Sequence, residues 1–189
     1  MIAAAGLARF TLVGFSAGGA IALDYALDHP QQVERLVLVG AGPSGAPPSA
    51  AASRRENRNF LPILFGNVPG VAANWAKDPW YIRQGDAAAK ARALAIWKAS
   101  PQNIRHLPVD PARPGPSALP RLPGLQVPTL FVVGDQDFPD ILANTEAAQA
   151  LIPGAKRIVV AGACHALQLE RPQQTAELIR DFVRATSAG

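Results

Sequence analysis

Four short apolar runs alternate with helical segments and limit this chain to one class of fold. The runs cover residues 9–14, 35–40, 128–134 and 157–160. The almost wholly apolar runs at 35–40 and 128–134 are typical of strands that are buried on both faces of a parallel sheet. Segments 17–28, 140–151 and 172–185 have helical patterns, and the last of them begins with a proline. The sequence therefore predicts an α/β fold with a parallel sheet of about four strands.

The chain divides into three predicted parts. Residues 1–41 carry the first strand, its helix and the second strand, and residues 124–189 carry the other two strands and the last helices. Between them, residues 42–123 contain a linker of Pro, Gly, Ser and Ala over 42–52, helical patterns over 54–107 with all three tryptophans, and a Pro-rich stretch. We expect this middle part to be a helical insertion.

A Gly-x-Ser-x-Gly motif joins the first predicted strand to the helix that follows it. Ser16 stands at its centre, where such a turn holds a nucleophile on a strained backbone. We expect Gly14 and Gly18 to lie where the neighbouring chain leaves no room for a side chain, with Gly19 extending this small-residue patch. The helix points its first amides at the same place, so the Ala17 N–H is the natural donor to an oxyanion. In a chain with 16 glycines the pattern alone also arises by chance. A catalytic role therefore depends on whether an acid and a base lie near Ser16.

Carboxylates and a histidine follow the last two predicted strands. Asp135 and Asp137 come directly after the third strand, and His165 comes after the fourth. Because the carboxyl ends of parallel strands share one edge of a sheet, we expect these residues close to Ser16. The order Ser, Asp, His along the chain is also the order of a triad on an α/β sheet.

Several residues near these positions have structural interpretations. Asp140 competes with Asp137 as the acid, but it immediately precedes a helix and suits its N-cap, and Asp135 suits a turn. His29 ends a helix and His106 lies in the insertion, so we interpret both as structural. Cys164 is adjacent to the candidate histidine, and we interpret it as a packing residue.

Three segments together resemble the α/β-hydrolase superfamily. They are residues 12–19, residues 127–137, and residues 162–165 with Leu169-Glu170-Arg171-Pro172 behind them. The resemblance covers nearly the whole chain. It implies that Ser16 is the nucleophile, that His165 is the base, and that Asp137, three residues after the strand-ending glycine, is the acid. The implied activity is that of a serine hydrolase acting on a small carboxylic ester, lactone or related acyl compound through an acyl-enzyme, with no cofactor and no metal.

The resemblance also implies that the insertion over residues 42–123 is a helical cap or lid above the nucleophile. Its large apolar side chains would line the substrate pocket together with the residue before the serine. The expected substrate-binding residues are Phe15, Trp75, Trp80 and Trp97. Ordinary helix packing is the alternative role for these aromatics. An apolar lid favours a small hydrophobic ester or lactone as the substrate.

The chain departs from the family at its start. Only a few residues precede Arg9, where the family has four more strands, so the resemblance implies the C-terminal half of the fold in an N-terminally truncated chain. The second oxyanion donor would then be missing. Residues 11–13 would form an exposed apolar edge strand open to self-association. The alternative function is therefore a catalytically deficient fragment that acts as a binding or interaction protein.

Composition limits the classes of partner. The 189 residues carry a net charge of +4, but the basic residues are scattered apart from Arg54, Arg55 and Arg58, so we expect no nucleic-acid partner. No apolar stretch approaches the roughly 20 residues that span a bilayer, so we expect no membrane partner. A single cysteine, Cys164, suits a reducing compartment, and we expect a cytoplasmic protein whose partner is a small acyl substrate.

Overall fold

The structure of the protein is a computed structural model, which describes residues 6–46, 49–100 and 117–186. Its elements in chain order are β1 (Phe10–Phe15), α1 (Ala17–Asp28), β2 (Val33–Val39), α2 (Ala50–Leu64), α3 (Val68–Lys77), α4 (Ala87–Ala99), the 3-10 helix η2 (Leu119–Gly124), β3 (Thr129–Gly134), α6 (Pro139–Leu151), β4 (Lys156–Val160), α7 (Leu167–Glu170) and α8 (Pro172–Ala185). The described strands form one sheet in the order β1-β2-β3-β4, and each neighbouring pair is parallel. The predicted α/β fold with a parallel sheet is confirmed.

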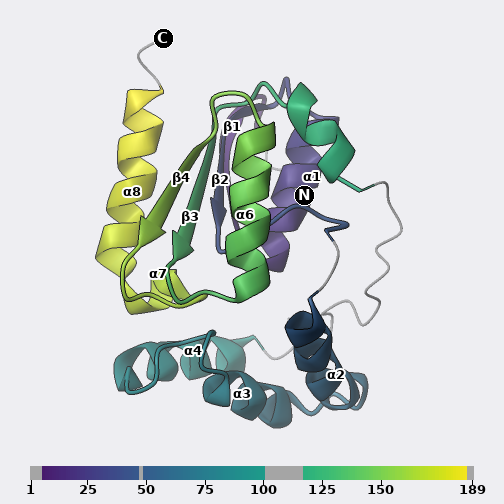
Figure 1. Cartoon of the computed structure of the whole chain (residues 1–189). Helices are drawn as coiled ribbons and strands as arrows, with labels where there is room; N and C mark the ends of the chain where they lie inside the picture. The colour runs from purple at the N-terminus through teal and green to yellow at the C-terminus, as the bar shows by residue number, and fades with distance from the viewer. Residues whose placement is uncertain (1–5, 47–48, 101–116, 187–189) are drawn as a thin grey trace.

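Each face of the sheet has its own apolar core. Successive side chains of a strand point to opposite faces, so Leu36 and Leu38 of β2 pack on the face covered by α1 and α6. Val37 and Val39 pack on the other face, where Phe182 of α8 covers them. Figure 1 shows the sheet between α8 on one side and α1 and α6 on the other. This burial on both faces explains why the centre of the sheet, in β2 and β3, is an almost continuous run of apolar residues.

The helices α2, α3 and α4 lie beyond the carboxyl ends of the strands, below the arrowheads in Figure 1. The Ser49 hydroxyl caps α2 by accepting a hydrogen bond from the Ala52 N–H at 3.0 Å. The predicted linker was therefore wrong for its last residues, because this cap starts the helix at Ala50. His106 and most of the Pro-rich stretch lie outside the described residues, and η2 occupies the end of that stretch.

β1 forms one edge of the described sheet, with Val13 47% exposed. Of the predicted exposed edge at residues 11–13, Val13 is exposed, whereas Thr11 and Leu12 are half-buried. Self-association through that edge stays a prediction, which size-exclusion chromatography would check. Among the residues that the structure describes, no helix combines the length and the apolar character needed to cross a membrane.

Candidate active site

Ser16 sits in the turn between β1 and α1 on a strained backbone. Its φ of 51° and ψ of −125° make it the only non-glycine residue with a positive φ in the part of the chain that the structure describes. Such a conformation persists only where the surroundings hold it. The Ser16 N–H donates to the Val39 carbonyl at 3.0 Å, and the Ser16 carbonyl accepts from the N–H groups of Gly19 and Ala20. The β1–β2 ladder and the first turn of α1 therefore fix the turn from both sides.

Close packing at this turn involves Gly14 and Gly19. A Cβ on Gly14 would lie 2.5 Å from the Gly19 Cα, and one on Gly19 would lie 2.3 Å from the Ala41 Cβ. The expectation for Gly14 is confirmed. The expectation for Gly18 was wrong, because a Cβ added to this residue would meet no other atom within 4 Å. The first turn of α1 leaves Gly18 exposed and directs the next residue, Gly19, against β1 and the segment after β2.

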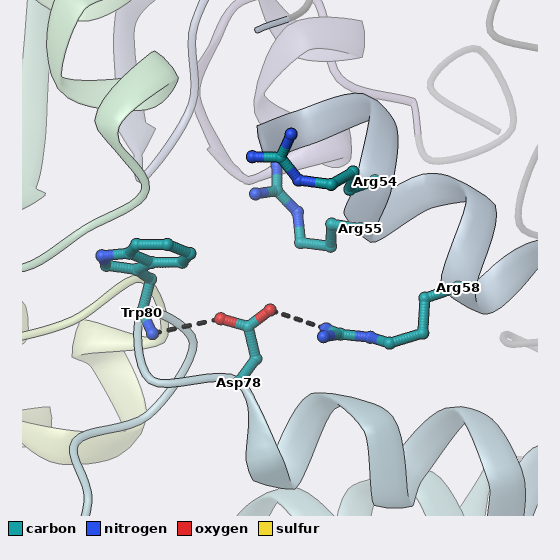
Figure 2. Close-up of a pocket in the computed structure, with 5 residues that line it drawn as sticks. All are labelled: Arg54, Arg55, Arg58, Asp78 and Trp80. Atoms are coloured by element: carbon teal, nitrogen blue, oxygen red, sulfur yellow. Dashed lines mark hydrogen bonds and ion pairs between the residues drawn. The ribbon is translucent and has the colours of Figure 1, made fainter. Parts of the chain in front are cut away.

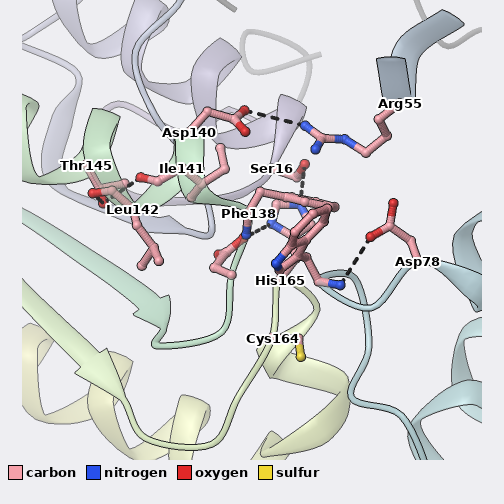
Figure 3. A network of polar contacts seen from close by, with 12 residues as sticks. Ser16, Arg55, Asp78, Phe138, Asp140, Ile141, Leu142, Thr145, Cys164 and His165 are labelled. Carbon is pink, nitrogen blue, oxygen red and sulfur yellow. Dashed lines mark hydrogen bonds and ion pairs between the residues drawn. The ribbon is translucent and has the colours of Figure 1, made fainter. Parts of the chain in front are cut away.

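The structure brings Ser16, His165 and Asp137 together in one hydrogen-bonded chain. The His165 Nε2 lies 2.8 Å from the Ser16 Oγ, and its Nδ1 lies 2.8 Å from the Asp137 Oδ1. His165 and Asp137 are 3% and 1% exposed, so neither exchanges its partner readily for water. Because the carboxylate accepts the Nδ1–H, the Nε2 is left as the acceptor that faces the serine hydroxyl. Figure 3 shows the Ser16 and His165 side chains of this chain joined by their hydrogen bond.

Neighbouring backbone groups hold Asp137 in place. The Phe138 N–H donates to the same Asp137 oxygen at 2.6 Å, and the Asp137 N–H donates to the Gly134 carbonyl. Gly40, with φ 54°, leaves no space beside the pair, because a Cβ there would lie 3.1 Å from the His165 Nδ1 and 3.3 Å from the Asp137 Oδ2. The carboxylate is thus oriented toward the imidazole before any substrate arrives.

The two competing aspartates have other partners. Asp135 lies in the turn after β3, as predicted, and its carboxylate accepts the Gly162 N–H at 2.8 Å. Asp140 is not the N-cap of α6, so that prediction was wrong. The helix begins at Pro139 with Phe138 as its cap residue, which places Asp140 in the first turn. There its carboxylate forms an ion pair with Arg55 at 3.5 Å.

The loop that carries His165 is bound to the segment before α4. The His165 N–H donates to the Trp80 carbonyl at 2.8 Å, and the next N–H donates to the Tyr81 carbonyl at 2.9 Å. Buried Glu170 accepts the N–H groups of Cys164 and Arg83. Sequence analysis gave Glu170 no role. Its signal in the sequence was a carboxylate five residues after the histidine, but only the fold reveals the two N–H groups from which it accepts hydrogen bonds.

Aromatic rings surround the imidazole. The ring centroids of Phe138, Phe15 and Tyr81 lie 4.7, 5.0 and 5.9 Å from that of His165. Phe138 is a contact that sequence analysis missed. Burial raises the pKa of Tyr81 well above its ordinary value, so its hydroxyl stays protonated. The rings keep the imidazole in an apolar setting in which its two hydrogen bonds are stronger than in water.

The predicted substrate-binding aromatics fall into two groups. Phe15 contacts His165, and Trp80 contacts Phe138 and lines a cavity. Trp75 and Trp97 instead pack on Tyr81, with ring centroids 4.8 and 5.9 Å from its own. Trp75 and Trp97 therefore support the wall of the site from behind, and a direct contact with substrate stays a prediction for all four.

Two further residues fit their predicted structural roles. Cys164 is fully buried, and this burial, followed by the charge of Glu170, raises the pKa of its thiol to about 12. His29 is the C-cap residue of α1, and its ring packs on that of Tyr25. Among the described residues, no group of three or more His, Cys, Asp or Glu side chains could hold a metal ion.

Comparison with known proteins identifies the fold family. The model of the alpha/beta hydrolase fold matches residues 1–172. The chain belongs to this family. Its strand-turn-helix with Ser16, and the loops after β3 and β4 that carry Asp137 and His165, are thus the parts of an α/β hydrolase that meet at the carboxyl edge of the sheet.

Individual relatives of this α/β hydrolase differ in their named activities. A protein of Bacillus subtilis (strain 168) that carries the name of a 2-succinyl-6-hydroxy-2,4-cyclohexadiene-1-carboxylate synthase is 23% identical over 94% of this chain and 66% of its own length. A pimeloyl-[acyl-carrier protein] methyl ester esterase of Aromatoleum aromaticum is 28% identical over 90% of this chain and 72% of its own length. The structure of Est816, described as an N-acyl homoserine lactone degrading enzyme, matches with a TM-score of 0.66 and 29% identity over 96% of this chain and 70% of that chain. The chain thus spans about two thirds of the length of these relatives.

Proposed function

We propose that this α/β hydrolase is a serine hydrolase that cleaves a carboxylic ester, lactone or related acyl compound through an acyl-enzyme. The observation that carries the proposal is the continuous chain from the Ser16 Oγ through His165 to Asp137, with two separations of 2.8 Å. These lie within the hydrogen-bond reach that proton transfer between nucleophile and base requires. Relatives named esterase and lactone-degrading enzyme support the same reaction class.

In the first half-reaction the Ser16 oxygen bonds to the acyl carbon while the His165 Nε2 takes its proton. The carbonyl π bond opens, and its electron pair forms an oxyanion. When the carbonyl re-forms, the bond to the leaving oxygen breaks and His165 returns the proton to that oxygen. Water then attacks the acyl-enzyme in the same way and releases the acid together with free Ser16. Neither half-reaction involves an oxidation or a reduction.

The surrounding groups would stabilise the charges that these steps create. Asp137 accepts the Nδ1–H and stabilises the imidazolium form of His165. The Ala17 N–H lies in the first turn of α1, where amides lack partners within the helix, so it can donate to the oxyanion. Cys164 contributes no nucleophile, because its raised pKa keeps the thiol protonated.

A burst experiment tests this function. p-Nitrophenyl acetate should give a stoichiometric burst of p-nitrophenolate followed by a slower steady state, as an acyl-enzyme accumulates. Ser16→Ala should abolish both phases. Ser100→Ala is the matched control, since Ser100 is the C-cap residue of α4 and forms no side-chain hydrogen bond with the triad. Mass spectrometry after labelling with a fluorophosphonate should place one adduct on the peptide that contains Ser16. Equal rates for wild type and Ser16→Ala, or an adduct elsewhere, would overturn the proposal.

A further inference from the structure

A cavity of about 330 Å³ lies between α2 and the loop before α4. Its lining is rich in cations: Arg54, Arg55, Arg58, Asp78 and Trp80. Figure 2 shows the three arginines extending from α2 toward Trp80 and Asp78. An apolar ester pocket has no need of three guanidinium groups, so this lining calls for a separate explanation.

One of the three arginines is paired with a buried carboxylate of the protein. The Arg58 guanidinium pairs with the buried Asp78 carboxylate at 2.8 Å, and the other oxygen of Asp78 accepts the Trp80 N–H at 3.1 Å. This arrangement fixes Trp80, which lies at the edge of the cavity (Figure 2). Arg58 therefore positions the wall, and a ligand would be bound by Arg54 and Arg55.

Arg55 is held in place but keeps a free donor. Its guanidinium carbon lies 3.7 Å from the centroid of the Phe138 ring, and one of its nitrogens forms the 3.5 Å pair with Asp140. Its other terminal nitrogen, Nη1, is buried and has no hydrogen-bond partner among the residues that the structure describes. A buried donor without an acceptor is costly, and a ligand acceptor would remove that cost.

Arg55 is linked to the triad through one shared neighbour, Phe138. The Phe138 ring contacts the Arg55 guanidinium and also contacts the His165 ring, whose centroid lies 4.7 Å from its own. One aromatic ring therefore separates the guanidinium from the imidazole. Figure 3 shows Arg55 directed toward the same region as the Ser16 side chain. An acyl chain bonded to Ser16 could therefore reach Arg55 with its far end.

The charges at the cavity favour a single negative charge on that far end. Three arginines face Asp78 and Asp140, which leaves a net charge of +1. The forked guanidinium matches a carboxylate with two parallel hydrogen bonds. We propose that Arg55, assisted by the exposed Arg54, is an anion subsite that selects acyl substrates with a carboxylate at the end opposite the scissile bond, such as half-esters of dicarboxylic acids. This inference rests on the proposed hydrolase function.

The test compares two esters of equal length. p-Nitrophenyl hydrogen adipate carries a terminal carboxylate, and p-nitrophenyl hexanoate does not. Wild type should show the higher kcat/KM for the adipate. In Arg55→Gln, kcat/KM for the adipate relative to the hexanoate should fall by about tenfold to a hundredfold, the range of a hydrogen bond to a charged group. Arg54→Gln should lower this ratio less, by about twofold to fivefold, because water screens an exposed charge.

Two further variants guard against a merely structural effect. Arg55→Gln combined with Asp140→Asn replaces the ion pair by a neutral pair, so it tests the subsite without leaving a carboxylate unpartnered. Arg180→Gln on α8 removes an exposed arginine far from the cavity and should leave the ratio unchanged. An unchanged ratio in both Arg55 variants, or an equal fall in Arg180→Gln, would overturn the subsite.

Binding separates this inference from the proposed function. Calorimetry with Ser16→Ala should show tighter binding of monoethyl adipate than of ethyl hexanoate, and the added Arg55→Gln change should remove the difference. If wild type hydrolyses neither ester, the proposed function fails, whereas the binding result still decides the subsite. Stronger competition by inorganic phosphate than by adipate would overturn the assignment to a carboxylate.

Discussion

The central strands of the sheet and the helix α2 bury their large apolar side chains very differently. In the sheet, Leu36 and Phe131 are completely buried in the core on the face that α1 and α6 cover. On α2 and at its end, Phe60 is 43% exposed, Leu64 is 56% exposed and Phe65 is 78% exposed. The triad residues all follow strands of the tightly packed sheet, whereas the arginines of the cavity come from α2. Proton transfer needs fixed distances, and substrate selection tolerates a less tightly packed support.

The first prediction concerns the proton-transfer chain at the sheet edge. Asp137→Asn should lower kcat for ester hydrolysis by about 10⁴-fold, because an amide no longer holds His165 in the required tautomer. The thermal midpoint should change little. Steady-state kinetics with p-nitrophenyl acetate measures the loss. Asp135→Asn is the matched control and should retain most activity, and a loss of the same size there would reassign the acid.

A second prediction tests the difference in packing with one residue type. Phe131→Ala should lower the free energy of unfolding by about 3 to 5 kcal/mol, since it opens a cavity in a fully buried core. Phe65→Ala should change it by less than about 0.5 kcal/mol, because its ring is mostly in water. Urea denaturation followed by far-ultraviolet circular dichroism compares the two. Similar losses would mean that α2 is as tightly packed as the sheet.

Close packing at the nucleophile turn gives a third prediction. Gly14→Ala should cost about 2 to 3 kcal/mol in the free energy of unfolding, because its Cβ would meet backbone atoms at 2.5 and 2.7 Å. Gly18→Ala should stabilise the protein by about 0.5 kcal/mol, since it adds a better helix former in open space. Urea titration of both variants provides the measurement. A destabilised Gly18→Ala would contradict the packing at this turn.

The smallest predicted effect appears at alkaline pH. Cys164 has an ordinary pKa of 9.0 that burial raises to about 12, so above pH 9 the unfolded chain loses this proton while the folded protein keeps it. Stability is therefore complete below pH 9 and falls as pH rises toward 12, by about 1 kcal/mol at pH 10. Cys164→Ala should remove this decline near pH 10 and keep kcat/KM within about twofold. An equal decline in both proteins would contradict the buried thiol.

The difference between the sheet and α2 also explains which features the sequence could predict. The strands, their parallel order and the meeting of Ser16, Asp137 and His165 follow from local patterns, because strand ends on one sheet must share an edge. Two of the wrong predictions concern single-residue geometry. Pro139 starts α6 before Asp140 could cap it, and the first turn of α1 buries Gly19 in place of Gly18.

The role of the cavity, in contrast, could not be predicted from the sequence. The grouping of Arg54, Arg55 and Arg58 is visible in the sequence, but its role depends on how α2 packs over Phe138 and beside Trp80. The orientation of a helix is set by contacts with distant residues, which no local pattern contains. For the same reason, the sequence alone could not show that Trp80 lines the cavity whereas Trp97 packs behind Tyr81.

The distance along the chain between the reacting groups has a consequence for folding. Ser16 and His165 are 149 positions apart, and they meet only after each parallel strand has paired with a neighbour remote in sequence. Folds dominated by such long-range contacts assemble slowly, since a large loop must close before the contact forms. Recovery of esterase turnover during refolding would therefore report the completion of the entire topology, whereas helical circular dichroism would report only its early local steps.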